Sequence, residues 1–102
     1  MDELEFVKTQ LESHVGKGNT ISAGEIEKML GYPVEGSHVK GRDLVKRCAE
    51  KYRIPVGGNI NGYYIINTES ELNEYTTNLK SRAQKTLERG DLMKKFYEER
   101  KK

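Results

Sequence analysis

Positive charge is concentrated in one short segment of this chain. Residues 36–56 carry six Lys and Arg residues and two acidic residues, whereas residues 1–35 carry three Lys residues and seven acidic ones. Clustered Lys and Arg side chains bind the phosphates of nucleic acids, because they displace the counterions condensed there. The segment therefore predicts phosphate binding, against the plainer alternative of a solvated charged helix face.

Helical spacing sorts this segment into two faces over residues 37–53, with Ser37 as the expected N-cap. The apolar face spans about 100° of the helix and contains Gly41, Leu44, Val45, Cys48 and Tyr52. The opposite face would enter a DNA groove with its N-terminal residues deepest. We expect base or near-base contacts from Ser37, His38, Lys40 and Arg42, and phosphate contacts from Lys46, Arg47 and Arg53.

Three residues of this helix have simpler roles open to them. His38 has no partner visible in the sequence, and a solvated imidazole would account for it equally well. Asp43 could accept a hydrogen bond from cytosine, but charge pairs with residues three or four positions along a helix are common. Cys48 is the only cysteine, and we expect it to be a small buried residue that packs in the core.

A β-hairpin is predicted immediately after the basic helix. Residues 54–56 and 63–66 are short apolar runs that flank a tip rich in Gly and Asn, which is the pattern of two strands and a tight turn. Pro55 cannot donate a backbone hydrogen bond, so its strand should lie at a sheet edge or bond through its carbonyls. The tip has no Lys or Arg, and we expect its contacts with DNA from Asn59, Asn61 and Tyr63.

Two shorter helices should precede the basic one. The first covers about four turns, with an apolar stripe of Leu4, Val7, Leu11 and Val15. Thr20 and Ile21 could then form a short strand beside the hairpin. Ser22 and Glu25 match a capping box, which starts a second helix that ends near Leu30 before a Gly and a Pro. This helix would turn three apolar residues toward the first helix: Ile26, Met29 and Leu30.

Beyond the hairpin, Thr68 and Glu71 form a second capping box and predict a fourth helix of about five turns. Gly90 and Asp91 indicate a break, followed by one or two amphipathic turns. The fourth helix would pack on the preceding residues and project into solvent, or it would pair with a second copy in a homodimer. The residues expected at such an oligomer interface are Leu72, Tyr75, Leu79, Leu92 and Phe96. We therefore divide the chain into a domain over residues 1–67 and a C-terminal extension over residues 68–102.

The sequence lacks the motifs that are typical of enzymes, metal-binding proteins and membrane proteins. There is no nucleophile elbow, phosphate loop or paired His spacing, so we expect no catalytic residues, no metal site, no cofactor and no small-molecule substrate. No run approaches the roughly 20 apolar residues that span a membrane. The acidic, mixed N-terminus also differs from a signal peptide. We accordingly expect a cytoplasmic protein that is not an enzyme.

The run RDLVKRCAEKYRIPVGGNINGYYII, followed by TESELNEYTTNLKSRAQKTLE, resembles the winged helix-turn-helix domains of small bacteriophage and prophage DNA-binding proteins. The resemblance covers about residues 20–89 and departs from the usual pattern at Cys48 and Tyr52. The matching elements are Arg42 with Asp43, Arg53 to Val56, Gly62 with Tyr63, Glu69 to Leu72, and Lys80 to Arg82. The resemblance implies a recognition helix, a wing and a role in phage transcription regulation or DNA replication.

The order of helix, turn, basic helix and hairpin predicts an α+β fold of the winged helix-turn-helix type, with three helices, a hairpin wing and a C-terminal helical extension. The expected function is binding to double-stranded DNA with the basic helix in the major groove. The alternative is a winged-helix module that binds or inhibits a host or phage protein, which the uncharged hairpin and the acidic first 35 residues favour.

Overall fold

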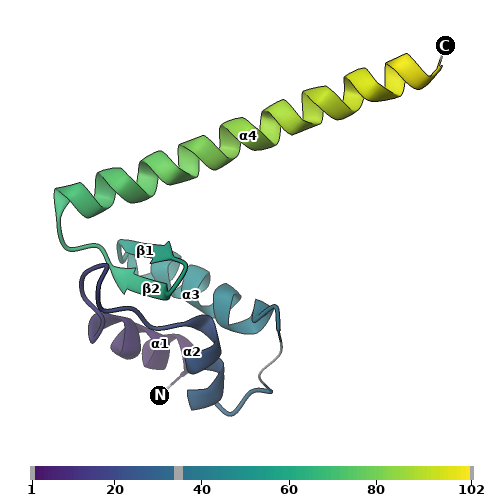
Figure 1. The fold of residues 1–102 in the computed structure, drawn as a ribbon. Helices are drawn as coiled ribbons and strands as arrows, with labels where there is room; N and C mark the ends of the chain where they lie inside the picture. Colours follow the sequence, from purple (N-terminus) through teal and green to yellow (C-terminus); the bar gives the residue numbers. More distant parts are fainter. Residues whose placement is uncertain (1, 34–35, 102) are drawn as a thin grey trace. The chain divides into compact units, whose positions relative to one another are not determined.

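The structure, a computed structural model, describes residues 2–33 and 36–101. In these residues the protein has an α+β fold, with four helices and a two-stranded antiparallel hairpin after the third helix (Figure 1). The elements are α1 (Glu3–Glu12), α2 (Ala23–Met29), α3 (Val39–Tyr52), β1 (Val56–Asn59), β2 (Gly62–Ile65) and α4 (Glu69–Lys101). The chain divides into two compact units, Met1–Leu72 and Asn73–Lys102, so that the boundary falls inside α4.

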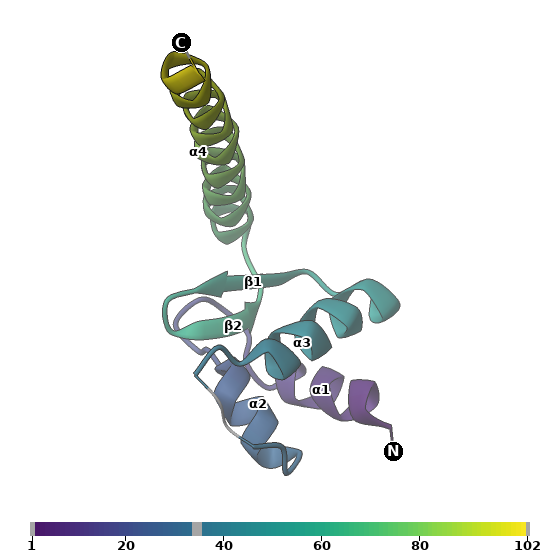
Figure 2. The same cartoon turned by 90° about the vertical axis from the view of Figure 1, so that its right-hand side faces the viewer.

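The core of the first unit lies between its three helices and one face of the hairpin (Figures 1 and 2). Helix α3 contacts both α1 and α2, and β2 contacts α1. The buried residues that form this core are Val7, Leu11, Ile21, Ile26, Leu44, Val45 and Cys48. The expected apolar face of α3 is confirmed, because Gly41, Leu44, Val45 and Cys48 are buried and Tyr52 packs against them. Burial also raises the pKa of the Cys48 thiol, as expected for a packing residue.

Helix α1 is shorter than predicted. It begins with Asp2 as N-cap and ends at Glu12, so Val15 is not part of a helical stripe. Val15 instead forms an isolated bridge with Ile65 and is 43% exposed. The backbone of residues 14–16 bonds to β2, because His14 O accepts from Ile65 N at 2.8 Å and Gly16 N donates to Ile65 O at 2.9 Å. Pairing with the hairpin thus replaces a further helical turn that the spacing alone would allow.

The predictions for Ile21 and the start of α2 are confirmed. Ile21 pairs with Tyr63 through two backbone hydrogen bonds of 2.7 and 2.9 Å, next to the hairpin. Ser22 and Glu25 form both bonds of the capping box. Helix α2 ends at Met29, and of the three apolar residues predicted to face α1, Ile26 and Leu30 join the core whereas Met29 is 50% exposed.

The start of α3 differs from the prediction. Its N-cap is His38, not Ser37, and His38 has left-handed backbone angles (φ 51°, ψ 38°) with no hydrogen bond from its own side chain to the helix end. Most L-residues adopt this conformation rarely, so it needs support from elsewhere in the structure. Between α2 and α3, after the predicted helix end at Gly31 and Pro33, positions 34 and 35 lie outside the described residues.

The hairpin has a two-residue loop, because Asn59 pairs with Gly62 at its end. Gly62 has φ +140°, and a Cβ at this position would lie 2.5 Å from Ile21 O, so the turn and the adjacent strand both require glycine here. The edge prediction for Pro55 is confirmed, since its carbonyl accepts from Ile66 N at 2.8 Å. Tyr64 is buried and lies across Gly57.

Helix α4 begins with the predicted capping box, in which Thr68 Oγ1 accepts from Glu71 N at 3.1 Å and Glu71 Oε1 accepts from Thr68 N at 3.3 Å. The predicted break at Gly90 is wrong, because α4 runs through it as one helix of 33 residues (Figure 1). Gly in an exposed helix costs only about 1 kcal/mol relative to Ala. The good helix formers on both sides of Gly90 offset that cost.

Candidate nucleic-acid interface

Helix α3 presents its basic residues on the side opposite the core. The exposed charged residues of this face are Lys40, Arg42, Asp43, Lys46, Arg47 and Glu50, and Arg53 is exposed just after the helix. Val39 also lies here and is 62% exposed. Of the seven residues predicted here, five therefore lie on or just after this exposed face, Ser37 is exposed just before the helix, and His38 is half-buried.

Few of these cations are engaged inside the protein. Arg47 Nη1 lies 3.6 Å from Asp43 Oδ2, but both side chains are more than half exposed, and such surface pairs contribute little stability. Lys40 Nζ lies 5.1 Å from the centre of the Tyr32 ring. Within residues 2–33 and 36–101, Arg42 and Lys46 form no ion pair. Their charges are consequently available to a ligand in solvent.

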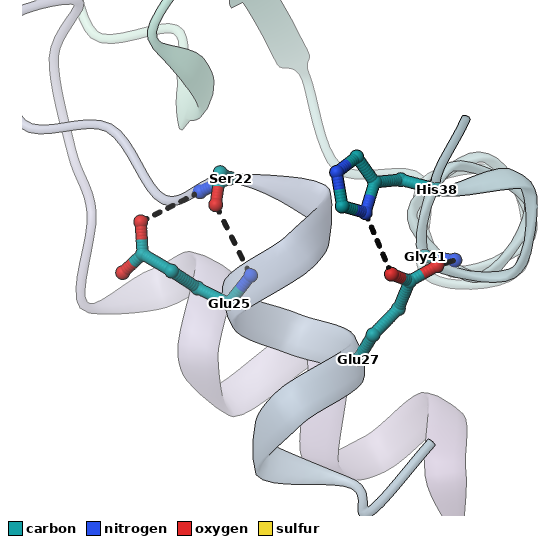
Figure 3. Close-up of polar contacts among 5 residues, drawn as sticks. All are labelled: Ser22, Glu25, Glu27, His38 and Gly41. Carbon is teal, nitrogen blue, oxygen red and sulfur yellow. Dashed lines mark hydrogen bonds and ion pairs between the residues drawn. The ribbon is translucent and has the colours of Figure 1, made fainter. Parts of the chain in front are cut away.

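The N-terminal end of α3 is held by Glu27, a residue of α2 that the sequence analysis did not identify. Glu27 is 2% exposed. One carboxylate oxygen accepts from the backbone N–H of Gly41 at 2.9 Å, and the other lies 2.8 Å from Nδ1 of His38 (Figure 3). Gly41 is the third residue of α3, so the carboxylate binds one of the helix's free N–H groups and faces the positive end of its dipole. Glu27 thus caps α3 from a neighbouring helix.

His38 takes part in this contact between α2 and α3. The alternative role given above, a fully solvated imidazole, therefore does not describe it. Its side chain is 34% exposed, and its pairing with Glu27 is the contact that supports the left-handed N-cap. The exposed part of the ring still borders the basic face of α3. No spacing rule pairs positions 27 and 38, so only the tertiary structure reveals this contact.

The surroundings of Glu27 favour its charged form. The hydrogen bond from His38 is the largest cause that lowers the pKa of this carboxyl, and the N–H of Gly41 is the next. Burial opposes both effects, but a carboxylate that accepts such bonds remains ionised below its usual range. The helix junction therefore contains a buried negative charge at neutral pH.

The hairpin residues predicted to contact DNA have different environments. Asn59 is exposed but bonded at both ends of its amide, to Asn61 N at 2.8 Å and to Lys17 O at 3.4 Å. Asn61 is exposed, whereas Tyr63 packs against the core. The loop between the strands also holds Ile60, which the sequence analysis did not select and which is 100% exposed. A large apolar residue within a tip of Gly and Asn is the sequence feature that could have identified Ile60 as a contact residue.

The five residues expected at an oligomer interface do not share one line on α4. Leu72, Leu79, Leu92 and Phe96 are exposed and Tyr75 is half-buried. Because α4 is continuous, Leu92 lies roughly 140° around the helix from Leu79 at 3.6 residues per turn. A single narrow interface cannot include both.

Within the described part of the chain, no group of three or more His, Cys, Asp and Glu side chains is placed to hold a metal ion. No helix of these residues is both long and apolar enough to cross a membrane. Comparisons of the chain with protein-family models, with curated proteins and with solved structures gave no match.

Proposed function

We propose that the first unit is a winged helix-turn-helix of the phage type that binds double-stranded DNA through α3. The observation that carries the proposal is the exposed basic face of α3, which is backed by a buried apolar face and followed directly by a hairpin. A recognition helix needs this division, because one side must be rigidly packed while the other reaches the groove. The order of elements is compatible with that architecture.

The dimensions of α3 suit this role. Its 14 residues give a length of about 21 Å, and a major groove about 12 Å wide admits one helix. Arg42 lies in the first turns of α3, near the end that enters a groove most deeply. Lys46 and Arg47 lie one turn further along, where phosphates of the groove edge would be met. This arrangement supports contacts of Arg42 with base edges and of Lys46 and Arg47 with phosphates.

Ile60 gives the hairpin a role that needs no basic residue. Its side chain is fully exposed at the loop. Contact of this apolar group with water is unfavourable, and burial against a ligand would relieve it. Apolar side chains that enter the minor groove contact sugars and base steps in many DNA-bending proteins. We propose that Ile60 makes such a contact beside the groove that α3 occupies.

The same features support a second candidate, a protein-binding module. An uncharged hairpin with an exposed Ile60 suits a protein surface, and residues 1–35 are net acidic. In this case α3 would be ordinary solvated surface. Absence of binding to duplex or single-stranded DNA at low salt, by folded protein, would favour this second function.

The first prediction concerns the salt dependence of DNA binding. Four to six phosphate contacts would give a slope of log K against log salt of about −3.6 to −5.4, and the double variant K46A/R47A should reduce its magnitude by about 2. Fluorescence anisotropy with random duplex DNA between about 50 and 200 mM salt measures both slopes. The matched control is K85A/K95A, which removes the same charge from exposed positions of α4. Equal slopes for wild type and K46A/R47A would contradict the proposal.

A second prediction concerns Ile60 and separates apolar from ionic contacts. Because Ile60 carries no charge, I60N should weaken duplex binding several-fold at every salt concentration while leaving the slope unchanged. I60V is the control, since it keeps an apolar side chain at the loop and should bind nearly as wild type does. The same anisotropy titrations test it. If I60N binds duplex DNA as tightly as wild type, the hairpin tip does not contact DNA.

A further inference from the structure

A regular stripe follows the exposed surface of α4 in the second unit. Its positions alternate in steps of four and three residues, which is the seven-residue repeat of helices that pack side by side. The stripe consists of Leu79, Ala83, Thr86, Gly90, Met93 and Tyr97, all of them exposed. We call these six residues the α4 seam. Because α4 continues through Gly90, the seam is unbroken from end to end.

The charges beside the α4 seam all have one sign. In a seven-residue repeat, the positions that flank the apolar line lie next to any helix that packs on it. The charged residues at these positions between Leu79 and Tyr97 are Lys80, Arg82, Arg89 and Lys94. The acidic residues of the same stretch, Glu88 and Asp91, fall at other positions of the repeat. None of the four cations forms an ion pair with another described residue.

A second copy of this chain is a poor occupant for the α4 seam. In a parallel pair, Arg89 of one copy would face Lys94 of the other, and in an antiparallel pair the basic flanks would again meet basic flanks. Like charges in these positions are destabilising. The small side chains of Ala83, Thr86 and Gly90 bury little apolar surface, so two identical seams offer little to offset the repulsion.

The α4 seam fits a helix of opposite character. Small residues at its centre leave room for large apolar side chains from a facing helix, while Leu79 and Tyr97 provide apolar contacts at the two ends. The basic flanks require acidic residues on both sides of that helix. A flat anionic surface would not need a seven-residue repeat or a line of small residues.

We propose that α4 is the docking surface for an acidic amphipathic helix of a different protein. The α4 seam provides the apolar contact, and Lys80, Arg82, Arg89 and Lys94 pair with acidic residues that flank the facing apolar stripe. This site lies in the second unit and does not depend on DNA binding by α3. It gives the protein a means of linking the first unit to an acidic partner.

The test uses two labelled peptides of about four heptads with the same Leu and Ile seam, one with Glu and the other with Lys at the flanking positions. Fluorescence anisotropy with the full chain should show at least tenfold tighter binding of the Glu peptide, and high salt should weaken that binding. The variant R89E/K94E should lose this preference. The matched control K85E/K95E changes the net charge equally at positions away from the seam flanks and should keep it.

Two companion measurements make every outcome decisive. Circular dichroism must show that R89E/K94E keeps the helix content of wild type, so that a loss of binding reflects charge and not folding. Light scattering of the full chain at tens of micromolar and low salt should give the mass of a monomer. A dimer that R89E/K94E abolishes or strengthens, equal binding of both peptides, or no binding of the Glu peptide would overturn the proposal. Binding to anionic vesicles or duplex DNA in place of the Glu peptide, lost in R89E/K94E, would also overturn it.

Discussion

Replacing Glu27 with Ala should lower the melting temperature of the first unit by about 10 °C or more. The substitution removes the carboxylate that accepts from Gly41 N at 2.9 Å and pairs with His38 Nδ1 at 2.8 Å. A backbone N–H at the start of α3 would then lose its partner in a place that water reaches poorly. The left-handed N-cap at His38 would lose its support as well.

The melting of E27A is best followed by near-ultraviolet circular dichroism, because four of the six tyrosines lie in residues 1–72. The matched control is E50A, which removes the same carboxylate from an exposed position of α3 and should change the melting temperature by little. E27Q should fall between the two, since an amide oxygen can still accept one of the two hydrogen bonds. If E27A has the same melting temperature as E50A, the cap formed by Glu27 does not stabilise the first unit.

The same residue predicts a dependence of stability on pH. The pKa of Glu27 is lowered in the folded protein, mainly by the hydrogen bond from His38 and then by Gly41 N. A carboxyl whose folded pKa is lowered contributes stability above its unfolded pKa, and this contribution is lost as the pH falls through the folded value. The difference in melting temperature between wild type and E27Q should therefore be largest near neutral pH and shrink on acidification below about pH 4.

Gly41→Ala should lower the free energy of unfolding of the first unit by about 1–3 kcal/mol. A Cβ at this position would lie 2.5 Å from the backbone oxygen of Ala23 and 3.0 Å from its Cβ. The atom in the way belongs to the backbone of α2, so relief requires α2 and α3 to move apart. That movement would also lengthen the hydrogen bond from Gly41 N to Glu27.

The control for Gly41→Ala is the same substitution at Gly90. Gly90 lies in α4, and a Cβ there would meet no atom within 4 Å. Ala is the better helix former by about 1 kcal/mol, so G90A should increase the helix content measured by far-ultraviolet circular dichroism. Urea unfolding followed by tyrosine signals measures G41A. If G41A is as stable as wild type, the close approach of α2 and α3 is not needed for the fold.

The variants E27A and G41A also bear on the proposed function. Glu27 and Gly41 fix how α3 sits against α2, but neither is one of the exposed cations proposed to bind DNA. At temperatures well below melting, we expect E27A and G41A to bind duplex DNA more weakly than wild type, while their salt slopes stay near the wild-type value. The number of phosphate contacts depends on the exposed cations of α3. The position of these cations depends on how Glu27 and Gly41 hold α3 against α2.

Local patterns predicted much of the first unit correctly. The capping box at Ser22 and Glu25, the buried face of α3, and the pairing of Ile21 with the hairpin all follow from side chains a few positions apart or from a simple alternation. The patterns were wrong at two places, for different reasons: a long-range contact near Val15 and the local helix preference of the residues around Gly90. Val15 continues the helical spacing of α1, yet its backbone region pairs with β2. Gly90 resembles a helix end, yet its neighbours keep α4 continuous.

The sequence by itself determined the order of the elements and the basic outer face of α3. These depend on periodicity, because side chains three or four positions apart on a helix share a face whatever the rest of the chain does. Only the tertiary structure decided how α3 begins. The type and position of Ser37 predict it as the cap, but the cap is the carboxylate of Glu27, which is 14 residues from Gly41 in the sequence. No local pattern encodes a hydrogen bond between two helices, since it exists only once their packing has brought the groups together.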